Sequence, residues 1–185
     1  MINDTLSEAD QKMGKSVAAT REEFAAIRAG RAAPSMFSKL TAEYYGTPTP
    51  IQQLASFTAP EARIIIVAPF DITAMPAIEK AIRESDLGVN PSNDGKTIRC
   101  VFPELTEERR KEYIKIAKAK AEDGKVSVRN IRRNAKQDLE KLEKDGEVGK
   151  DDVTGAEKRL DGMTKKHTDE IDELLKNKEA ELLEV

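Results

Sequence analysis

Lysine and arginine residues in the C-terminal half of the chain recur at a helical spacing. With each residue advancing about 100° around a helix, five of them from residue 118 onward fall within about 40° of one line, and Lys111 lies alongside it. We call this set the basic stripe; it comprises Lys118, Lys125, Arg129, Arg132 and Lys136. Regularly spaced cationic side chains match the phosphates of a nucleic-acid backbone without reading its sequence. The stripe contains no aromatic residue, which disfavours stacking on single-stranded bases.

Two interpretations of the basic stripe remain open. It is either a solvated face neutralised by acids on a neighbouring helix, or a surface that binds phosphates. Arginine is concentrated between residues 128 and 133, where Arg133 adds a third guanidinium, and the planar arginine fork suits phosphate. Residues 106–136 carry a net charge of +6 and residues 137–185 a net charge of −7, so the acids lie mostly beyond the stripe. These features favour an RNA backbone as the ligand.

The residues that catalysis usually requires are scarce. The chain has one histidine, His167, and one cysteine, Cys100, which excludes an intrachain disulfide and a His/Cys metal cluster. It has no phosphate-binding glycine loop, no Gly-x-Ser-x-Gly and no His-Glu-x-x-His. His167 falls on an apolar helix face and is expected to be packed. We therefore expect no enzyme activity, no cofactor and no metal.

The elements that must position the basic stripe are long helices. All 8 prolines lie between Pro34 and Pro103, and both flanks show apolar residues at spacings of three and four. The first helix is predicted over residues 3–28, with Gly30 as a left-handed C-cap. The second begins at the N-cap Thr106 and ends near residue 144, and the third begins near residue 151. Three such helices with a short connection predict an antiparallel, up-down-up bundle.

The middle of the chain reads as strands, turns and one short helix. Residues 40–45 open this segment, strands are expected at residues 62–68 and 96–102, and residues 51–57 are expected to be extended. Residues 46–50 are expected to form a turn, 88–95 a loop, and 71–85 a helix capped by Asp71 or Thr73. Cys100 alternates with Ile98 and Phe102, so these three should share a buried face. The prediction is an α+β fold: a bundle of residues 1–30 and 105–185, with an inserted β/α/β domain of residues 31–104.

Composition indicates the kind of fold and the cellular compartment to expect. Charged residues make up 35% of the 185 residues and aromatics 4%, which suits helices that each bury one stripe. No apolar run approaches about 18 residues and no signal peptide is evident, so a cytoplasmic protein with no membrane partner is expected. A monomer is expected because three helices bury each other's apolar faces. The rivals are a self-associating coiled-coil scaffold, a chaperone-like RNA-binding module, and an enzyme of the inserted domain.

Short segments along the chain resemble one family when they are taken in order. They include Arg28-Ala-Gly-Arg-Ala-Ala-Pro34, Tyr44-Tyr-Gly-Thr-Pro-Thr-Pro50, Ala77-Ile-Glu-Lys-Ala-Ile82, Ser85-Asp-Leu-Gly-Val-Asn-Pro91, Leu105-Thr-Glu-Glu-Arg-Arg-Lys111, Arg129-Asn-Ile-Arg-Arg133 and Lys178-Glu-Ala-Glu-Leu-Leu183. Each segment alone is a weak signal, but the combination is specific. Over essentially its whole length, the chain resembles the bacterial ribosome recycling factors.

The resemblance implies a function and a set of contacts. It implies an L-shaped protein that binds large-subunit ribosomal RNA at the intersubunit face of a post-termination ribosome. Elongation factor G, using GTP, would then push on the smaller domain and separate the subunits. The arginines at 129, 132 and 133 match the family's RNA-binding residues, and Arg28, Gly30 and Arg31 match its elbow region. The predicted RNA-binding residues are Arg129, Arg132, Arg133, Lys136, Lys125, Lys118, Arg28 and Arg31; the predicted hinge residues, in the two connections to the inserted domain, are Gly30, Pro34, Pro103 and Leu105.

Overall fold

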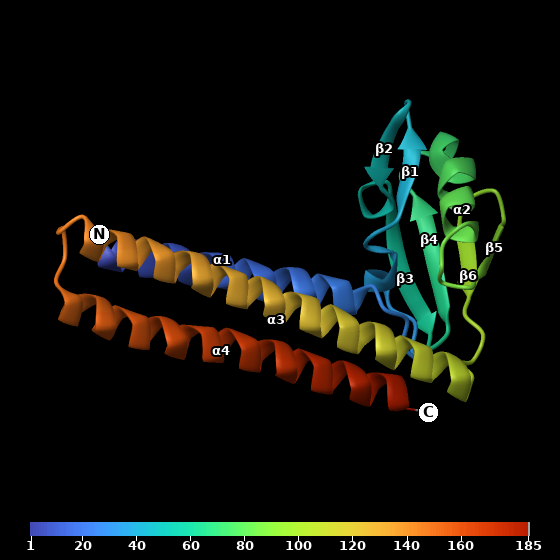
Figure 1. The fold of residues 1–185 in the computed structure, drawn as a ribbon. Helices are drawn as coiled ribbons and strands as arrows, with labels where there is room; N and C mark the ends of the chain where they lie inside the picture. Colours follow the sequence, from blue (N-terminus) through green and yellow to red (C-terminus); the bar gives the residue numbers. More distant parts are fainter. Residues whose placement is uncertain (185) are drawn as a thin grey trace. The chain divides into compact units, whose positions relative to one another are not determined.

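The computed structural model describes residues 1–184, which form two compact units (Figure 1). The first, here called the helical unit, comprises Met1–Phe24 and Lys115–Glu179. The second, the sheet unit, comprises Ala25–Ile114 and the described residues from Ala180 onward. The α+β fold class predicted from the sequence is confirmed. The boundaries differ from those predicted, since residues 25–30, 105–114 and 180–184 group with the sheet unit.

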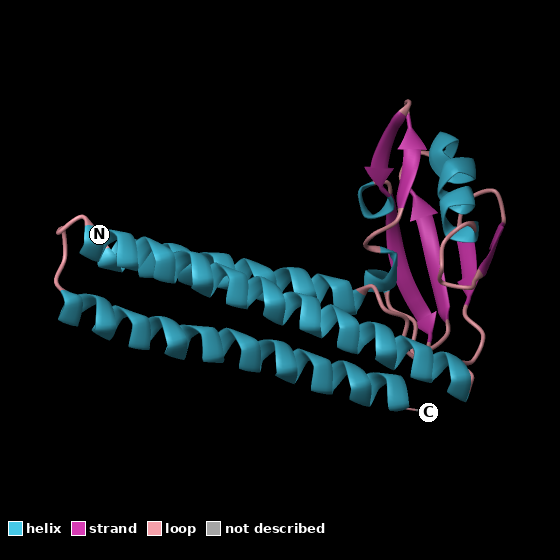
Figure 2. Ribbon diagram, viewed as in Figure 1, coloured by secondary structure: helices cyan, strands magenta, loops and turns pink. Residues whose placement is uncertain are grey.

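Long helices supply the helical unit (Figure 2). They are α1 (Ile2–Ala25), α3 (Glu107–Lys144) and α4 (Lys150–Leu183). Ser16 of α1 shares a hydrogen bond of 2.8 Å with Ser127 of α3, and Glu23 pairs with Lys120 at 3.3 Å. Later residues of α1 thus meet earlier residues of α3, so these helices are antiparallel. Figure 1 shows α4 running in the same direction as α1, which is the predicted up-down-up order.

Both ends of α3 follow local capping rules. The hydroxyl of Thr106 accepts a hydrogen bond of 3.1 Å from the backbone N–H three residues on, as the sequence predicts for an N-cap. At the other end Gly146 has a φ of 74°. Its N–H donates to Glu143 and the N–H of Glu147 donates to Leu142, each over 3.0 Å. This pair of bonds is a Schellman motif, which requires the left-handed backbone that glycine adopts most readily.

The predicted end of α1 was wrong. The helix ends at Ala25, not at Arg28, and Gly30 does not adopt a left-handed backbone. Ile27 and Arg28 are both buried and belong to the sheet unit. Side-chain burial there overrides the helical periodicity that continues through these residues, because tertiary packing outweighs intrinsic propensity.

A glycine allows α1 and α3 to approach closely in the helical unit. Gly124 is buried, and a Cβ built on it would lie 2.3 Å from Oγ1 of Thr20 and 3.2 Å from Cδ1 of Ile171. Thr20 is itself buried, and its hydroxyl donates to the carbonyl of Ser16 over 2.9 Å. That hydroxyl cannot turn aside without losing its hydrogen bond. Packing therefore requires glycine at a mid-helix position where it is intrinsically unfavourable.

Substituting Gly124 with alanine should destabilise the helical unit. Overpacking typically costs about 1–3 kcal/mol and the gain in helix propensity returns about 1 kcal/mol, so a net loss of about 1–2 kcal/mol is expected in urea denaturation followed by circular dichroism. Gly155→Ala is the matched control in α4. Nothing lies within 4 Å of its added Cβ, so it should stabilise the chain. A Gly124→Ala variant as stable as Gly155→Ala would contradict the close-approach argument.

The only histidine in the chain lies on the buried side of α4. His167 is 6% exposed, and its Nε2 lies 2.7 Å from Oδ1 of Asp10 in α1. The expectation of a packed histidine is therefore confirmed.

The sheet unit is built on antiparallel strands. Its strands are β1 (Thr41–Tyr44), β2 (Thr47–Pro50), β3 (Ala55–Glu61), β4 (Ile64–Pro69), β5 (Asn90–Asn93) and β6 (Ile98–Val101). Short helices accompany them: α2 (Met75–Arg83) and the 3-10 turns η1 (Pro34–Phe37), η2 (Ile51–Gln53) and η3 (Ile72–Ala74). Among the described residues, β1 and β2 form a hairpin, and the other strands form a sheet of order β3-β4-β6-β5. The hairpin turns at Tyr45 and Gly46, both with positive φ, which suits a type I′ turn.

Two strands lie where the sequence predicted a turn and a loop. Residues 47–50 form β2 and residues 90–93 form β5, and Ile51–Gln53 is a 3-10 turn within a segment expected to be extended. Both unexpected strands contain proline, and both lie at the edge of their sheets. Edge strands tolerate proline because one row of backbone groups has no strand partner. These segments are strands because each pairs with a neighbouring strand, and their own composition would not predict it.

The core of the sheet unit matches the predicted buried face. Ile98, Cys100 and Phe102 are each at most 1% exposed. Ile78 and Ile82 of α2 are fully buried in the same hydrophobic cluster. The helical turn before α2 begins at Asp71, whose carboxylate accepts a hydrogen bond of 2.9 Å from the N–H of Thr73; Asp71 is thus the predicted cap.

Candidate nucleic-acid interface

The basic stripe lies on α3 within the helical unit, along the side that meets α4. Val128 and Ala135 of the same helix are buried, whereas Lys118 and Arg129 are more than half exposed. The predicted separation between an apolar face and a basic face of this helix is therefore present in the structure.

Carboxylates of α4 contact three members of the stripe. The Nζ atom of Lys118 lies 3.9 Å from Glu179, that of Lys125 lies 3.0 Å from Asp172, and Nε of Arg132 lies 2.7 Å from Asp161. These pairs are all partly solvent-exposed. The acids lie beyond the stripe in the sequence, but the expectation that they also lie away from it in the folded chain was wrong. The fold turns the acidic C-terminal segment back along the stripe, because α4 runs antiparallel to α3.

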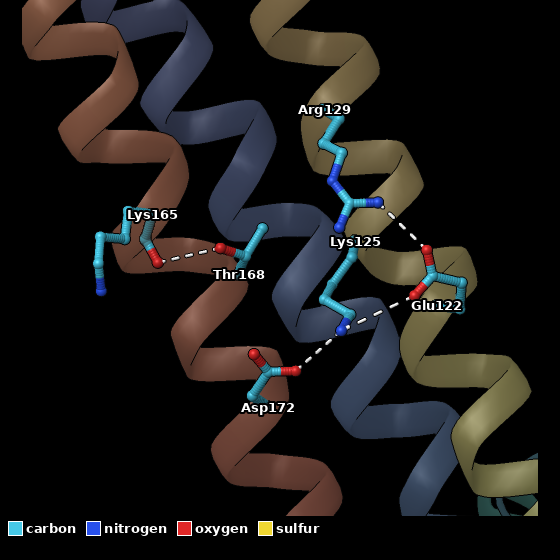
Figure 3. Close-up of polar contacts among 6 residues, drawn as sticks. All are labelled: Glu122, Lys125, Arg129, Lys165, Thr168 and Asp172. Atoms are coloured by element: carbon cyan, nitrogen blue, oxygen red, sulfur yellow. Dashed lines mark hydrogen bonds and ion pairs between the residues drawn. The ribbon is translucent and has the colours of Figure 1, made fainter.

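A carboxylate of α3 itself also contacts the stripe, pairing with Lys125 and with a fourth member, Arg129 (Figure 3). Glu122 accepts a hydrogen bond of 3.1 Å from Nη1 of Arg129 and lies 3.7 Å from Nζ of Lys125. Figure 3 shows Lys125 reaching both Glu122 and Asp172, on two different helices. This part of the stripe is a network of exposed ion pairs, each contributing about 0–1 kcal/mol to stability.

The spacing of these α4 acids in the sequence indicates that they lie on one face of the helix. Asp161, Asp172 and Glu179 are separated by eleven and seven residues, a spacing that returns to the same face of a helix. They therefore form a line on α4 that parallels the basic line on α3. Periodic charges on two antiparallel helices are the pattern from which ion pairs across an interface can be predicted.

Some cationic groups of this region are not paired with any carboxylate of residues 1–184. The Nη atoms of Arg132 make no hydrogen bond to a described residue, and neither Arg133 nor Lys136 forms an ion pair with one. Arg133 is exposed and Lys136 is half-buried. These groups, spaced three and four residues along α3, can each donate to a phosphate oxygen without first breaking an internal bond.

Arg28 lies in a different environment from the one expected of an RNA contact. It is 5% exposed, its guanidinium lies over the ring of Phe102 at 5.4 Å, and it donates a hydrogen bond to the carbonyl of Pro103. Burial lowers the pKa of Arg28 from its usual value. We therefore correct its expected role: the side chain is packed inside the sheet unit, while Arg31 is exposed.

Substitution of Arg28 with alanine should loosen the sheet unit. Losing a hydrogen bond from a charged group costs about 1.5–3 kcal/mol, which corresponds to an open state populated about 10- to 100-fold more. The thiol of Cys100 reports this opening, because it is fully buried and burial raises its pKa to about 12. Labelling by a thiol reagent under native conditions should accelerate in Arg28→Ala and remain unchanged in Arg31→Ala. Unchanged labelling in both variants, with ribosome binding lost only in Arg28→Ala, would restore the contact role.

The predicted hinge residues all lie within the sheet unit. Gly30 is half-buried, and a Cβ there would lie 3.3 Å from the carbonyl oxygen of Glu184. Pro34 opens the 3-10 turn η1, Pro103 accepts the hydrogen bond from Arg28, and Leu105 is buried. Bending at these residues stays a prediction.

Other kinds of site were sought in the described part of the chain. Residues 1–184 contain no group of three or more His, Cys, Asp or Glu side chains arranged to hold a metal ion. No helix there is both long enough and apolar enough to span a membrane.

Three long antiparallel helices and a small sheet unit, with a basic line on one helix, define a two-unit α+β protein. A model of the family described as "Ribosome recycling factor" matches residues 20–183. The chain is 77% identical to the ribosome-recycling factor of Nocardioides sp. and 64% identical to that of Streptomyces coelicolor, over the full length of each chain. The chain belongs to the ribosome recycling factor family, as its sequence resemblance indicated.

Solved structures agree with this assignment. A solution structure of the ribosome recycling factor superposes with a TM-score of 0.77 at 40% identity, covering 100% of this chain and 98% of the other. A second match, with a TM-score of 0.69 at 40% identity, covers both chains completely. Its subject is the T. thermophilus ribosome recycling factor and E. coli elongation factor G bound to the E. coli post-termination complex.

Proposed function

We propose that this chain binds the post-termination ribosome in the cytoplasm and, with elongation factor G and GTP, separates the subunits and releases mRNA. The observation that carries the proposal is the family match, which includes both the helical unit and the sheet unit. The neighbour bound to the post-termination complex together with elongation factor G supports the choice of partners. The chain acts without catalysing a reaction of its own, since GTP hydrolysis belongs to the elongation factor.

In this proposal the basic stripe supplies the contact with large-subunit ribosomal RNA at the intersubunit face. Phosphate contacts give affinity without sequence readout, which suits a protein that binds one fixed place on the ribosome. The available Nη atoms of Arg132, together with Arg133 and Lys136, support this role. The exposed ion pairs along the rest of the stripe contribute little to stability and can exchange for phosphates at small cost.

The sheet unit is the part on which elongation factor G would act. Residues 31–104 carry little net charge and no arginine stripe, so they offer little to an RNA backbone. We propose bending near Gly30, Pro34, Pro103 and Leu105, which would let one part of the chain stay bound while the other is pushed.

A splitting assay tests the proposal. Post-termination ribosomes are mixed with the chain, and light scattering follows subunit separation with and without elongation factor G and GTP. Separation only when all components are present is the expected result. Pelleting of the chain with ribosomes but no separation under any condition would leave an RNA-binding module that does not recycle ribosomes. Equilibrium sedimentation of the chain alone should show a monomer; a stable dimer at micromolar concentration would favour the coiled-coil scaffold.

A further inference from the structure

The ion pair between Arg132 and Asp161 differs from its neighbours in the atom that it uses. Asp161 Oδ1 accepts from Nε of Arg132 over 2.7 Å, and the Nη atoms make no hydrogen bond to any residue among 1–184. By contrast, Arg129 is bonded through Nη1 and Lys125 through Nζ. In those two side chains the internal carboxylate occupies a terminal nitrogen that a phosphate would need.

Bonding at Nε leaves the outer edge of a guanidinium available. The group is planar and donates in a fixed fork, so a bond to Nε fixes the plane while the two Nη atoms still point away from the side-chain stem. These Nη atoms can donate two parallel hydrogen bonds to one phosphate. A long arginine side chain otherwise loses much rotamer freedom when it binds.

The anchor for this bond is rigid. Asp161 follows Leu160, which is 1% exposed on the buried side of α4. The carboxylate itself is 58% exposed and the arginine 38% exposed, so the pair lies at the surface where a phosphate can approach. The backbone that carries Asp161 is thus fixed by packing, and its side chain can hold Arg132 in one orientation.

We propose that Asp161 is a positioning residue, which orients Arg132 through Nε so that its Nη fork meets a phosphate of the ribosomal RNA. The inference rests on the proposed function and identifies a second residue, an acid, on which RNA binding depends. The predicted change in affinity is opposite to that expected from charge alone. Removing the negative charge of Asp161 from the surface of an RNA-binding protein should weaken RNA binding.

The alternative is that Asp161 merely competes with phosphate for Arg132. Two variants that remove the same charge separate these roles. The amide introduced by Asp161→Asn keeps an oxygen that can accept from Nε, whereas Asp161→Ala removes the acceptor. Positioning predicts that Asp161→Ala binds 70S ribosomes about 3- to 10-fold more weakly than Asp161→Asn, the fold-change expected for ordering one flexible side chain. Competition predicts that both variants bind equally and at least as tightly as the unmodified chain.

Asp169 provides the matched control. It lies on the same helix and is also 58% exposed, and its ion pair, over 2.6 Å, is with Lys165 of α4 itself. Asp169→Ala and Asp169→Asn should bind 70S ribosomes with equal affinity. A difference between them as large as that at position 161 would show that the alanine effect is general to α4, and would overturn the inference.

A double-variant cycle ties the effect to Arg132. With Arg132→Ala present, Asp161→Ala and Asp161→Asn should bind equally, because the side chain to be positioned is gone. A difference that persists in the Arg132→Ala background would overturn the inference, as would equal binding of the two variants when Arg132 is present. If Arg132→Ala alone leaves ribosome binding unchanged, the proposed role of the stripe fails instead, so the two failures are distinguishable.

Discussion

Replacing Arg132 with alanine is expected to weaken binding to post-termination ribosomes about 10- to 100-fold, because a hydrogen bond from a charged group contributes roughly 1.5–3 kcal/mol. The Nη atoms of Arg132 are available, and the neighbours Arg129 and Lys136 lie on the same line of α3. Arg132→Lys should recover part of the affinity, since lysine keeps the charge but loses the bidentate fork.

A salt titration distinguishes a phosphate contact from a change in fold. Loss of one contact should reduce the slope of log affinity against log salt by about 0.7–0.9. The melting curve of Arg132→Ala should stay close to that of the unmodified chain, because an exposed ion pair contributes only about 0–1 kcal/mol and alanine favours helix. Normal binding by Arg132→Ala across the whole titration would mean that the basic stripe is only a solvated face.

Replacing Gly30 with proline is expected to separate binding from splitting. Ribosome affinity should change less than about threefold, while the splitting rate with elongation factor G and GTP should fall about tenfold or more, because proline fixes φ where bending is proposed. Proline also restricts the backbone of the preceding residue. Its ring must be accommodated where a Cβ would lie 3.3 Å from the carbonyl oxygen of Glu184.

Gly30→Ala is the control for this experiment. It adds the same Cβ but does not lock φ in a ring and keeps the backbone N–H, so it should retain more splitting activity than the proline variant. Native-state labelling of Cys100 checks that the sheet unit remains closed in both variants. Equal loss of binding and splitting in Gly30→Pro would show that this segment only positions contacts and does not bend.

Local signals in the sequence predicted several elements correctly. Thr106 begins α3 and the Asp145–Gly146 segment ends it, and alternation along residues 98–102 identified the buried strand face. Each of these depends on residues within a few positions of one another. Capping bonds and the alternation of side chains along a strand depend only on nearby residues, so the sequence specifies them directly.

Edge strands and the end of α1 required the tertiary structure. β2 has proline at two of its four positions, and β5 consists of asparagine, proline and serine; only their pairing with β1 and β6 makes them strands. Residues 26–28 continue a helical pattern, yet Arg28 leaves the helix to pack against Phe102. In each case a partner outside the segment itself outweighs a local preference: the adjacent strand for β2 and β5, and the distant Phe102 for Arg28.

The candidate site divides in the same way. The sequence determined the line of basic residues on α3, because the period of a helix follows from backbone geometry alone. Only the tertiary structure decided which of these cations pair across the helix interface, because Asp161, Asp172 and Glu179 belong to α4 and reach α3 when the two helices pack antiparallel. The same packing placed Asp161 against the inner nitrogen of Arg132. The distances between atoms in the folded chain determine which nitrogen of a side chain remains available to bind phosphate. The order of residues in the sequence does not give these distances.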